Sequence, residues 1–160
     1  MNKERYAFDQ LMILLDQVVA RMNATHAPAN DYGTGIPLYR VEIHTIQAIG
    51  LNPGINVSDL ARNMSVTKGA ISQTVNKLAR KGLVRKTHVG ADSREISLLL
   101  TDLGWVAYHQ HEAYHEQMYR LVRAYFGNRF RSKLKTYTAV MKELNNIISS
   151  LENQSGEIRL

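Results

Sequence analysis

The segment Thr67-Lys-Gly-Ala-Ile-Ser-Gln-Thr-Val-Asn-Lys-Leu-Ala-Arg-Lys81 decides the fold of this 160-residue chain. Apolar residues recur in it at steps of three and four, which predicts a helix with one buried face of Ile71, Thr74, Val75 and Leu78. Thr67 is expected to cap the helix, since its hydroxyl can accept a hydrogen bond from a first-turn amide. Taken alone, the pattern also fits an ordinary amphipathic helix with a solvated face. That outward face, however, carries side chains suited to base edges and phosphates: Ser72, Gln73, Asn76, Lys77 and Arg80.

A second helix and a hairpin flank this segment, and their order is more informative than any one of them. Residues 57–64 predict a short helix capped by Asn56, and only two residues separate it from Thr67. After the segment, two β-prone runs at 83–89 and 95–100 are joined by a short turn. Helix, turn, helix and hairpin in this order are typical of a winged helix-turn-helix, whose second helix enters a major groove of DNA.

A resemblance to a known family rests on the hairpin and on the two helices. The residues similar to the wing signature of MarR transcriptional regulators are Asp92, Arg94, Leu98, Leu100 and Thr101. The segments that match the family's helix-turn-helix are 60–61, 66–70 and 78–84. The resemblance implies that Arg94 reaches the minor groove and that Asp92 orients it. A guanidinium suits a narrow, electronegative minor groove, and a carboxylate two residues away can fix its orientation. The expected DNA-contacting residues are Thr67, Lys68, Ser72, Gln73, Asn76, Lys77, Arg80, Asp92 and Arg94.

The positive charge of the chain is concentrated in the same region. Residues 62–94 contain eight Lys or Arg against Asp92 alone, a net charge of +7, so the formal charge of +6 leaves −1 for the rest. A charge confined to the helix-turn-helix and the wing predicts a polyanion at that surface, and double-stranded DNA is the expected partner.

Apolar stripes at both ends of the chain predict helices that pack against other helices. A single copy has little to bury both stripes against, because the winged unit fills its own core. We therefore expect a homodimer formed by these ends. It would present two recognition helices to major grooves about 34–36 Å apart, which predicts a palindromic operator. The stripes comprise Phe8, Leu11, Leu15, Val18 and Met22 near the start, and Phe130, Leu134, Tyr137, Met141, Leu144, Ile148 and Leu151 near the end.

The predicted fold is therefore mainly α with a small β wing, and forms one structural domain. Residues 38–100 are expected to form the winged helix-turn-helix DNA-binding region. Residues 1–37 and 101–160 are expected to form the helical dimerisation region that flanks it.

Four of the six histidines are expected to meet where these two regions join. His111 and His115 are four apart on a predicted helix, which places their β-carbons about 5–6 Å apart on one face. Two imidazoles so placed can bind one metal ion at about 2.0–2.1 Å. His26 ends the first helix, and His44 lies in the second. The predicted ligands suit Zn first, with Ni or Cu as alternatives.

The zinc-responsive members of the MarR family resemble this histidine pattern. They have an acidic residue near the end of the first helix, a histidine in the second and a His-x3-His motif in the long helix. His44, His111 and His115 match by type, whereas His26 stands where the family has an acid. The alternative is that these histidines line a pocket for a small phenolic or other organic effector, or are polar surface residues.

The predicted function is a homodimeric, sequence-specific DNA-binding regulator, a repressor, whose DNA affinity depends on a divalent metal. The alternatives are the same regulator released by an organic effector, and a DNA-binding protein of architectural type without sequence preference. A metal-dependent hydrolase is a more distant alternative. Four histidine ligands leave no open position for a substrate, and the sequence has no nucleophile elbow, phosphate-binding loop or His-Glu-x-x-His motif. The chain is expected not to be an enzyme.

Cysteine content and hydropathy restrict the function further. The sequence has no cysteine, which excludes thiol-based peroxide sensing and thiolate metal ligands. No apolar run approaches the length of a membrane span, and the N-terminus lacks the pattern of a signal peptide. A cytoplasmic protein with no membrane partner is therefore expected.

Overall fold

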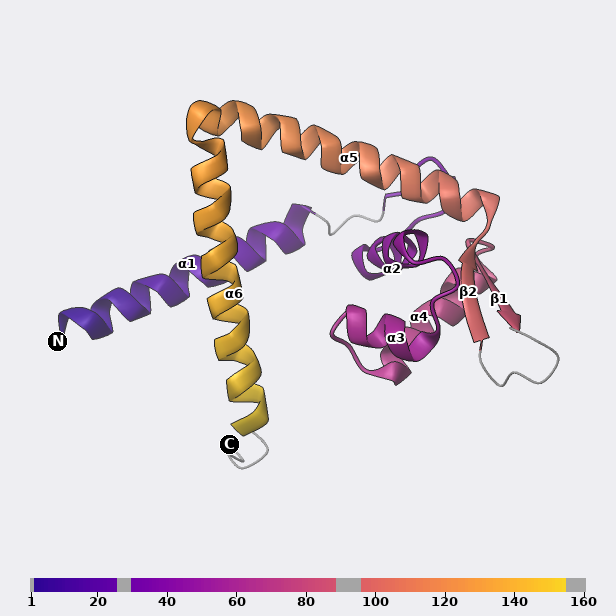
Figure 1. Cartoon of the computed structure of the whole chain (residues 1–160), viewed down its shortest axis with the longest axis horizontal. Helices are drawn as coiled ribbons and strands as arrows, with labels where there is room; N and C mark the ends of the chain where they lie inside the picture. Colours follow the sequence, from indigo (N-terminus) through magenta and orange to yellow (C-terminus); the bar gives the residue numbers. More distant parts are fainter. Residues whose placement is uncertain (1, 26–29, 89–95, 155–160) are drawn as a thin grey trace. The chain divides into compact units, whose positions relative to one another are not determined.

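The computed structural model describes residues 2–25, 30–88 and 96–154 of the chain (Figure 1). Two antiparallel strands and long helices confirm the predicted fold class, which is mainly α with a small β wing. The elements in chain order are α1 (Lys3–Thr25), α2 (Arg40–Leu51), α3 (Val57–Asn63), α4 (Lys68–Arg80), β1 (Val84–His88), β2 (Ile96–Leu100), α5 (Asp102–Phe126), the 3-10 turn η1 (Gly127–Arg129) and α6 (Phe130–Gln154).

Side-chain caps start both helices of the helix-turn-helix. Asn56 Oδ1 accepts from the backbone N–H of Asp59 at 2.8 Å, and Thr67 Oγ1 accepts from the backbone N–H of Ala70 at 3.2 Å. Each bond satisfies a first-turn amide that has no partner within the helix. The turn between the helices passes through Ser65, whose φ of 54° allows the abrupt change of direction. Both predicted caps are confirmed.

The wing is a two-stranded antiparallel sheet that a third segment joins by a single bridge. Its register runs from Val84 opposite Leu100 to His88 opposite Ile96. The segment before α3 adds an antiparallel bridge, in which Leu98 N donates to the carbonyl of Ile55 at 3.0 Å. The sheet therefore holds the start of α3 against the wing. The turn between the strands lies outside the described residues.

The core lies within the winged unit and is built from α2, α3, α4, the sheet and the start of α5. The predicted inward residues Ile71, Val75 and Leu78 are buried, as expected from their spacing. Thr74 was predicted on the same face, but it is half-exposed and lines a groove beside α2. Its position at the edge of the apolar arc explains the difference. Other large buried side chains are Leu38, Ile43, Ile46, Ile49, Leu60, Leu83 and Leu98.

The start of α5 is fitted closely against the chain that precedes the wing. Thr101 Oγ1 accepts from Gly104 N at 3.1 Å and donates to the Gly82 carbonyl at 2.7 Å. Gly104 is buried, and a β-carbon there would lie 2.1 Å from the carbonyl oxygen of Leu83. A glycine is therefore required at this position by close approach of the backbone.

Gly104→Ala is expected to lower the free energy of unfolding by about 2–3 kcal/mol, because backbone atoms must shift to admit the methyl group. Gly69→Ala is the matched control. Gly69 also lies in the first turn of a helix, but a β-carbon there has no neighbour within 4 Å. Urea denaturation should show Gly69→Ala to be as stable as the wild type or more so. Equal stability of the two variants would contradict the close fit.

The chain divides into two compact units, Met1–Ala113 and Tyr114–Leu160. In the second unit, aromatic rings connect the end of α5 to α6, with Tyr119 and Phe130 centroids 5.6 Å apart and Phe126 and Tyr137 centroids 5.9 Å apart. The division predicted from the sequence follows expected role, with residues 38–100 for DNA binding and the flanking regions for dimerisation. That division differs from the division into compact units, and it stays a prediction.

Candidate nucleic-acid interface

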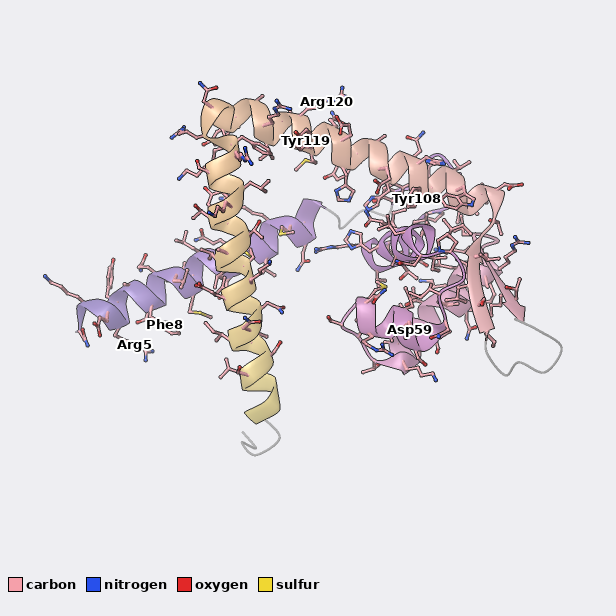
Figure 2. All side chains as sticks on the ribbon, viewed as in Figure 1. Arg5, Phe8, Asp59, Tyr108, Tyr119 and Arg120 are labelled. Carbon is pink, nitrogen blue, oxygen red and sulfur yellow. The ribbon has the colours of Figure 1, made fainter. Side chains whose placement is uncertain are left out.

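Helix α4 presents a polar and cationic face on the side opposite its buried residues. Of the predicted DNA-contacting residues, Ser72 is half-exposed, and the exposed ones are Thr67, Lys68, Gln73, Asn76, Lys77 and Arg80. Asp92 and Arg94 lie outside the described residues. Within the part of the chain that the structure describes, the predicted helix residues are therefore accessible to a ligand. The short helix α3, whose Asp59 is labelled in Figure 2, precedes α4 across the turn.

An open pocket of about 340 Å³ lies along one side of this face, between α4, the start of α3 and the wing. Helix α4 contributes Lys68, Ser72 and Asn76 to its lining. The wing contributes Lys86, whose Nζ donates a hydrogen bond to Asn76 Oδ1. Sequence reasoning missed Lys86 as a site residue, because its contact with α4 depends on how the wing packs. The alternation of the strand was the available signal, because it places Lys86 on the same face as the buried Val84, the face that packs on α4.

A groove on the other side of the face separates α4 from the start of α2. Its lining includes Gln73, Thr74 and Lys77 of α4 and Val41 of α2. Asn76 lines both this groove and the pocket beside the wing, so it lies on the outer midline of α4. A residue on that midline is placed to meet the floor of a major groove if the helix enters one.

A buried carboxylate at the start of α2 connects it to the end of α4. Glu42 is 1% exposed, and its Oε1 and Oε2 each accept from Lys81 Nζ at 2.8 Å. Glu42 Oε2 also accepts from the backbone N–H of Tyr39 at 2.8 Å, at the first turn of α2. Lys81 Nζ donates in addition to the carbonyl of Pro37 at 2.7 Å. Sequence reasoning missed this cluster, although a glutamate between the apolar residues Val41 and Ile43 was a signal of it.

The cluster keeps Glu42 ionised and holds one of the predicted phosphate-binding cations. Burial disfavours the charged form of Glu42, but the hydrogen bonds from Lys81 and Tyr39 and the charges of Lys81 and Lys77 outweigh it. The pKa of Glu42 is therefore lowered from its usual 4.5. Lys77 Nζ lies 3.4 Å from Glu42 Oε1 and 5.1 Å from the centroid of the Tyr39 ring. Lys77 is thus oriented before any ligand arrives, while about half of its side chain stays exposed.

Two of the four predicted metal ligands lie side by side. The ring centroids of His44 on α2 and His111 on α5 are 5.4 Å apart, and Tyr32 packs edge-on against His111 at 5.6 Å. His111 is buried and His44 is half-buried. His115 is exposed and belongs to the second compact unit, and His26 lies outside the described residues. Within the described ranges, no three His, Cys, Asp or Glu side chains form a group that could hold a metal ion.

The long helices do not have the character of membrane spans. Within the described residues, no helix combines the length and the apolar content needed to cross a bilayer.

Comparisons of the sequence place the winged region in a known family. Residues 37–95 match the model of the MarR family. The HTH-type transcriptional regulator YhjH of Bacillus subtilis is 28% identical over 96 residues, which cover 60% of this chain and 55% of that protein. YvnA of the same organism, also an HTH-type transcriptional regulator, is 29% identical over 98 residues, which cover 61% of this chain and 62% of that protein. The chain thus spans little more than half the length of these relatives.

Solved structures share the fold at low sequence identity. A MarR family transcription regulator superimposes with a TM-score of 0.73 at 17% identity, covering 96% of this chain and 99% of that one. FabT of Streptococcus pneumoniae, in complex with DNA, gives 0.63 at 21% identity, covering 94% and 99%. ZitR of Lactococcus lactis, a zinc-responsive MarR family member, gives 0.60 at 15% identity, covering 83% and 97%. The family model, the relatives and the fold agree: the winged region of this chain, residues 37–95, belongs to the MarR family, and its fold is that of a winged helix-turn-helix.

Proposed function

We propose that this chain is a homodimeric, sequence-specific repressor that binds a palindromic operator in the cytoplasm. The observation that carries the proposal is the face of α4, where exposed amide and cationic side chains stand opposite a fully buried apolar face. Amides such as those of Gln73 and Asn76 can read base edges, whereas Lys68 and Arg80 can bind phosphates. The excess of positive charge in residues 62–94 supports the same conclusion.

A homodimer is supported by the apolar side chains that the single chain leaves exposed. On α1, Phe8 (Figure 2) is 54% exposed and Val18 is 52% exposed. On α6, Leu134 is 53% and Ile148 is 55% exposed. These residues belong to the predicted stripes, and contiguous exposed apolar surface of this kind marks an interaction site. A second copy of the chain is the proposed occupant, because each copy brings the same stripes and a two-fold axis suits a palindromic site.

The function is tested by selecting DNA sequences that the purified protein binds and by measuring affinity for the selected operator. Arg94→Ala is expected to weaken operator binding by about 1–3 kcal/mol with the fold intact, as for a well-placed contact to nucleic acid. Lys77→Ala should weaken binding to all sequences alike and reduce the salt dependence. Binding without sequence preference would contradict the regulator and favour an architectural protein. Unchanged operator affinity of Arg94→Ala at moderate salt would contradict the role of the wing.

We further propose that a divalent metal, Zn in the first instance, raises DNA affinity as a corepressor. The supporting observation is the pair His44 and His111, whose rings are close enough for both imidazoles to bind one ion. His26 and His115 are the proposed further ligands. An ion held by His44 and His111 would tie α2 to α5, the helix that leaves the wing. Metal changes DNA affinity only through its preference for the DNA-competent arrangement of these helices.

The double variant His111→Ala, His115→Ala is expected to abolish stoichiometric metal binding and to make operator affinity insensitive to chelator. Metal affinity of the wild type should fall as pH drops, since protonated imidazoles cannot bind the ion. Metal content is measured on protein purified without an affinity tag, and operator binding is measured with and without chelator. If the wild type binds no divalent metal at micromolar concentration, or binds it with no effect on operator affinity, the organic-effector alternative replaces this proposal.

A further inference from the structure

A contact between the wing and the recognition helix constrains the chemistry of the residue at the centre of the candidate interface. Lys86, on β1 opposite Leu98, donates from Nζ to Oδ1 of Asn76. Both side chains are exposed and line the pocket between α4 and the wing. Asn76 also lines the groove on the other side of α4. The amide on the midline of α4 is therefore engaged from one side by a cation of the wing.

The contact determines which way the amide of Asn76 points. An ammonium group has three N–H donors and no acceptor, so the amide atom next to Lys86 Nζ must be the oxygen. An amide flipped by 180° would place its own NH2 group against the ammonium, which is unfavourable. The Nδ2 group of Asn76 is consequently directed away from Lys86, and one of the two lone pairs of Oδ1 is taken by the ammonium. A second donor that approached Oδ1 would lie beside that ammonium, which disfavours it.

An amide held in this way offers donors to a base. The usual bidentate contact of asparagine with adenine needs both amide atoms, because Oδ1 accepts from N6 while Nδ2 donates to N7. Guanine offers two acceptors in the major groove, N7 and O6, and no donor. Asn76 Nδ2 and the remaining N–H groups of Lys86 match that pattern.

We propose that Asn76 and Lys86 act as one donor-only unit that reads a guanine in each half of the operator, with Lys86 as the residue that sets the specificity of Asn76. The inference rests on the proposed DNA-binding function. Lys86 could instead bind only a backbone phosphate, in which case its loss would weaken all sequences alike.

The test begins with the operator selected by the wild-type protein. The position read by Asn76 is the one at which Asn76→Ala loses its base preference, and a guanine is expected there. Replacing that guanine by 7-deazaguanine, which lacks the N7 acceptor, should lower wild-type affinity about tenfold and leave the affinity of Asn76→Ala unchanged.

The variant Lys86→Met then distinguishes an effect on base preference from a general loss of electrostatic attraction to DNA. The variant removes one positive charge and also releases Oδ1 of Asn76, so the preference for guanine over adenine should fall at least about fivefold or reverse. Lys68→Met is the matched control, since Lys68 lines the same pocket. It should lower affinity for the guanine and adenine operators by the same factor. Circular dichroism checks that each variant is folded.

Three outcomes would overturn the inference. One is a wild-type preference for adenine at the Asn76 position, and another is that Asn76→Ala changes the preference at no position. The third is an equal loss of affinity of Lys86→Met for both operators, as in Lys68→Met. Failure of the proposed function would be seen earlier and separately, because the wild type would then select no sequence at all.

Discussion

Replacing Glu42 by alanine is expected to lower the free energy of unfolding by about 3–5 kcal/mol, the usual cost of removing one partner from a buried ion pair. The carboxylate is buried and accepts from Lys81 and from the backbone of Tyr39. Without this carboxylate, the ammonium of Lys81 keeps its hydrogen bond to the carbonyl of Pro37 but loses its hydrogen bonds to Glu42. The side chain of Lys81 is only 19% exposed, so water replaces the lost partner poorly. Urea denaturation at a fixed protein concentration measures the effect.

Glu116→Ala is the matched control for Glu42→Ala. Glu116 also accepts from a basic side chain at 2.8 Å, that of Arg120 (Figure 2), but both residues are more than half exposed. An exposed pair of this kind contributes only about 0.3–0.5 kcal/mol. If the two substitutions had equal effects, the burial of the Glu42 cluster would not matter for stability.

The pH dependence of stability provides a second measure of the same cluster. The pKa of Glu42 is lower in the folded chain than its usual 4.5, so the folded state binds this proton less readily than the unfolded state. The stabilisation is therefore fully present above about pH 4.5 and is lost as the pH falls through the lower, folded value. The wild type should lose its advantage over Glu42→Gln in that acidic range. An advantage that persists unchanged to the lowest pH at which both proteins fold would contradict the lowered pKa.

Ile148→Asp is expected to dissociate the proposed homodimer. In a single chain Ile148 is 55% exposed, so an aspartate there would be solvated at little cost. In the proposed dimer the same position lies in the seam, and a two-fold interface buries the substitution twice. Two unpaired carboxylates should cost at least about 4 kcal/mol together, which raises the dimer dissociation constant about a thousandfold. The large effect on the dissociation constant is therefore expected only if Ile148 packs against a second copy of the chain.

Light scattering over a range of concentrations measures the mass of each variant. Asn146→Asp is the matched control, because it adds the same charge to α6 on the side opposite the apolar stripe. It should remain a dimer at concentrations where Ile148→Asp is a monomer or unfolds. A dimer of normal affinity in Ile148→Asp would show that the stripe of α6 does not form the seam.

The sequence by itself determined the elements of this protein and their order. Periodic apolar residues predicted α4 and its buried Ile71, Val75 and Leu78, and short side-chain caps predicted where α3 and α4 start. These features are local, because each depends on residues within a few positions of one another along the chain. The similarity to the MarR family followed from the same stretch, since the matched residues 37–95 contain the helix-turn-helix.

Only the tertiary structure decided which side chains meet across those elements. Glu42 and Lys81 are 39 positions apart, and nothing local predicts that a carboxylate of α2 is buried against the end of α4. The contact of Lys86 with Asn76 requires the wing to pack beside the recognition helix, and the fit of Gly104 against Leu83 requires α5 to start close to the chain that precedes β1. The period of a helix or strand defines the face on which a residue lies. Which residues of other elements it contacts depends on how whole helices and strands pack together.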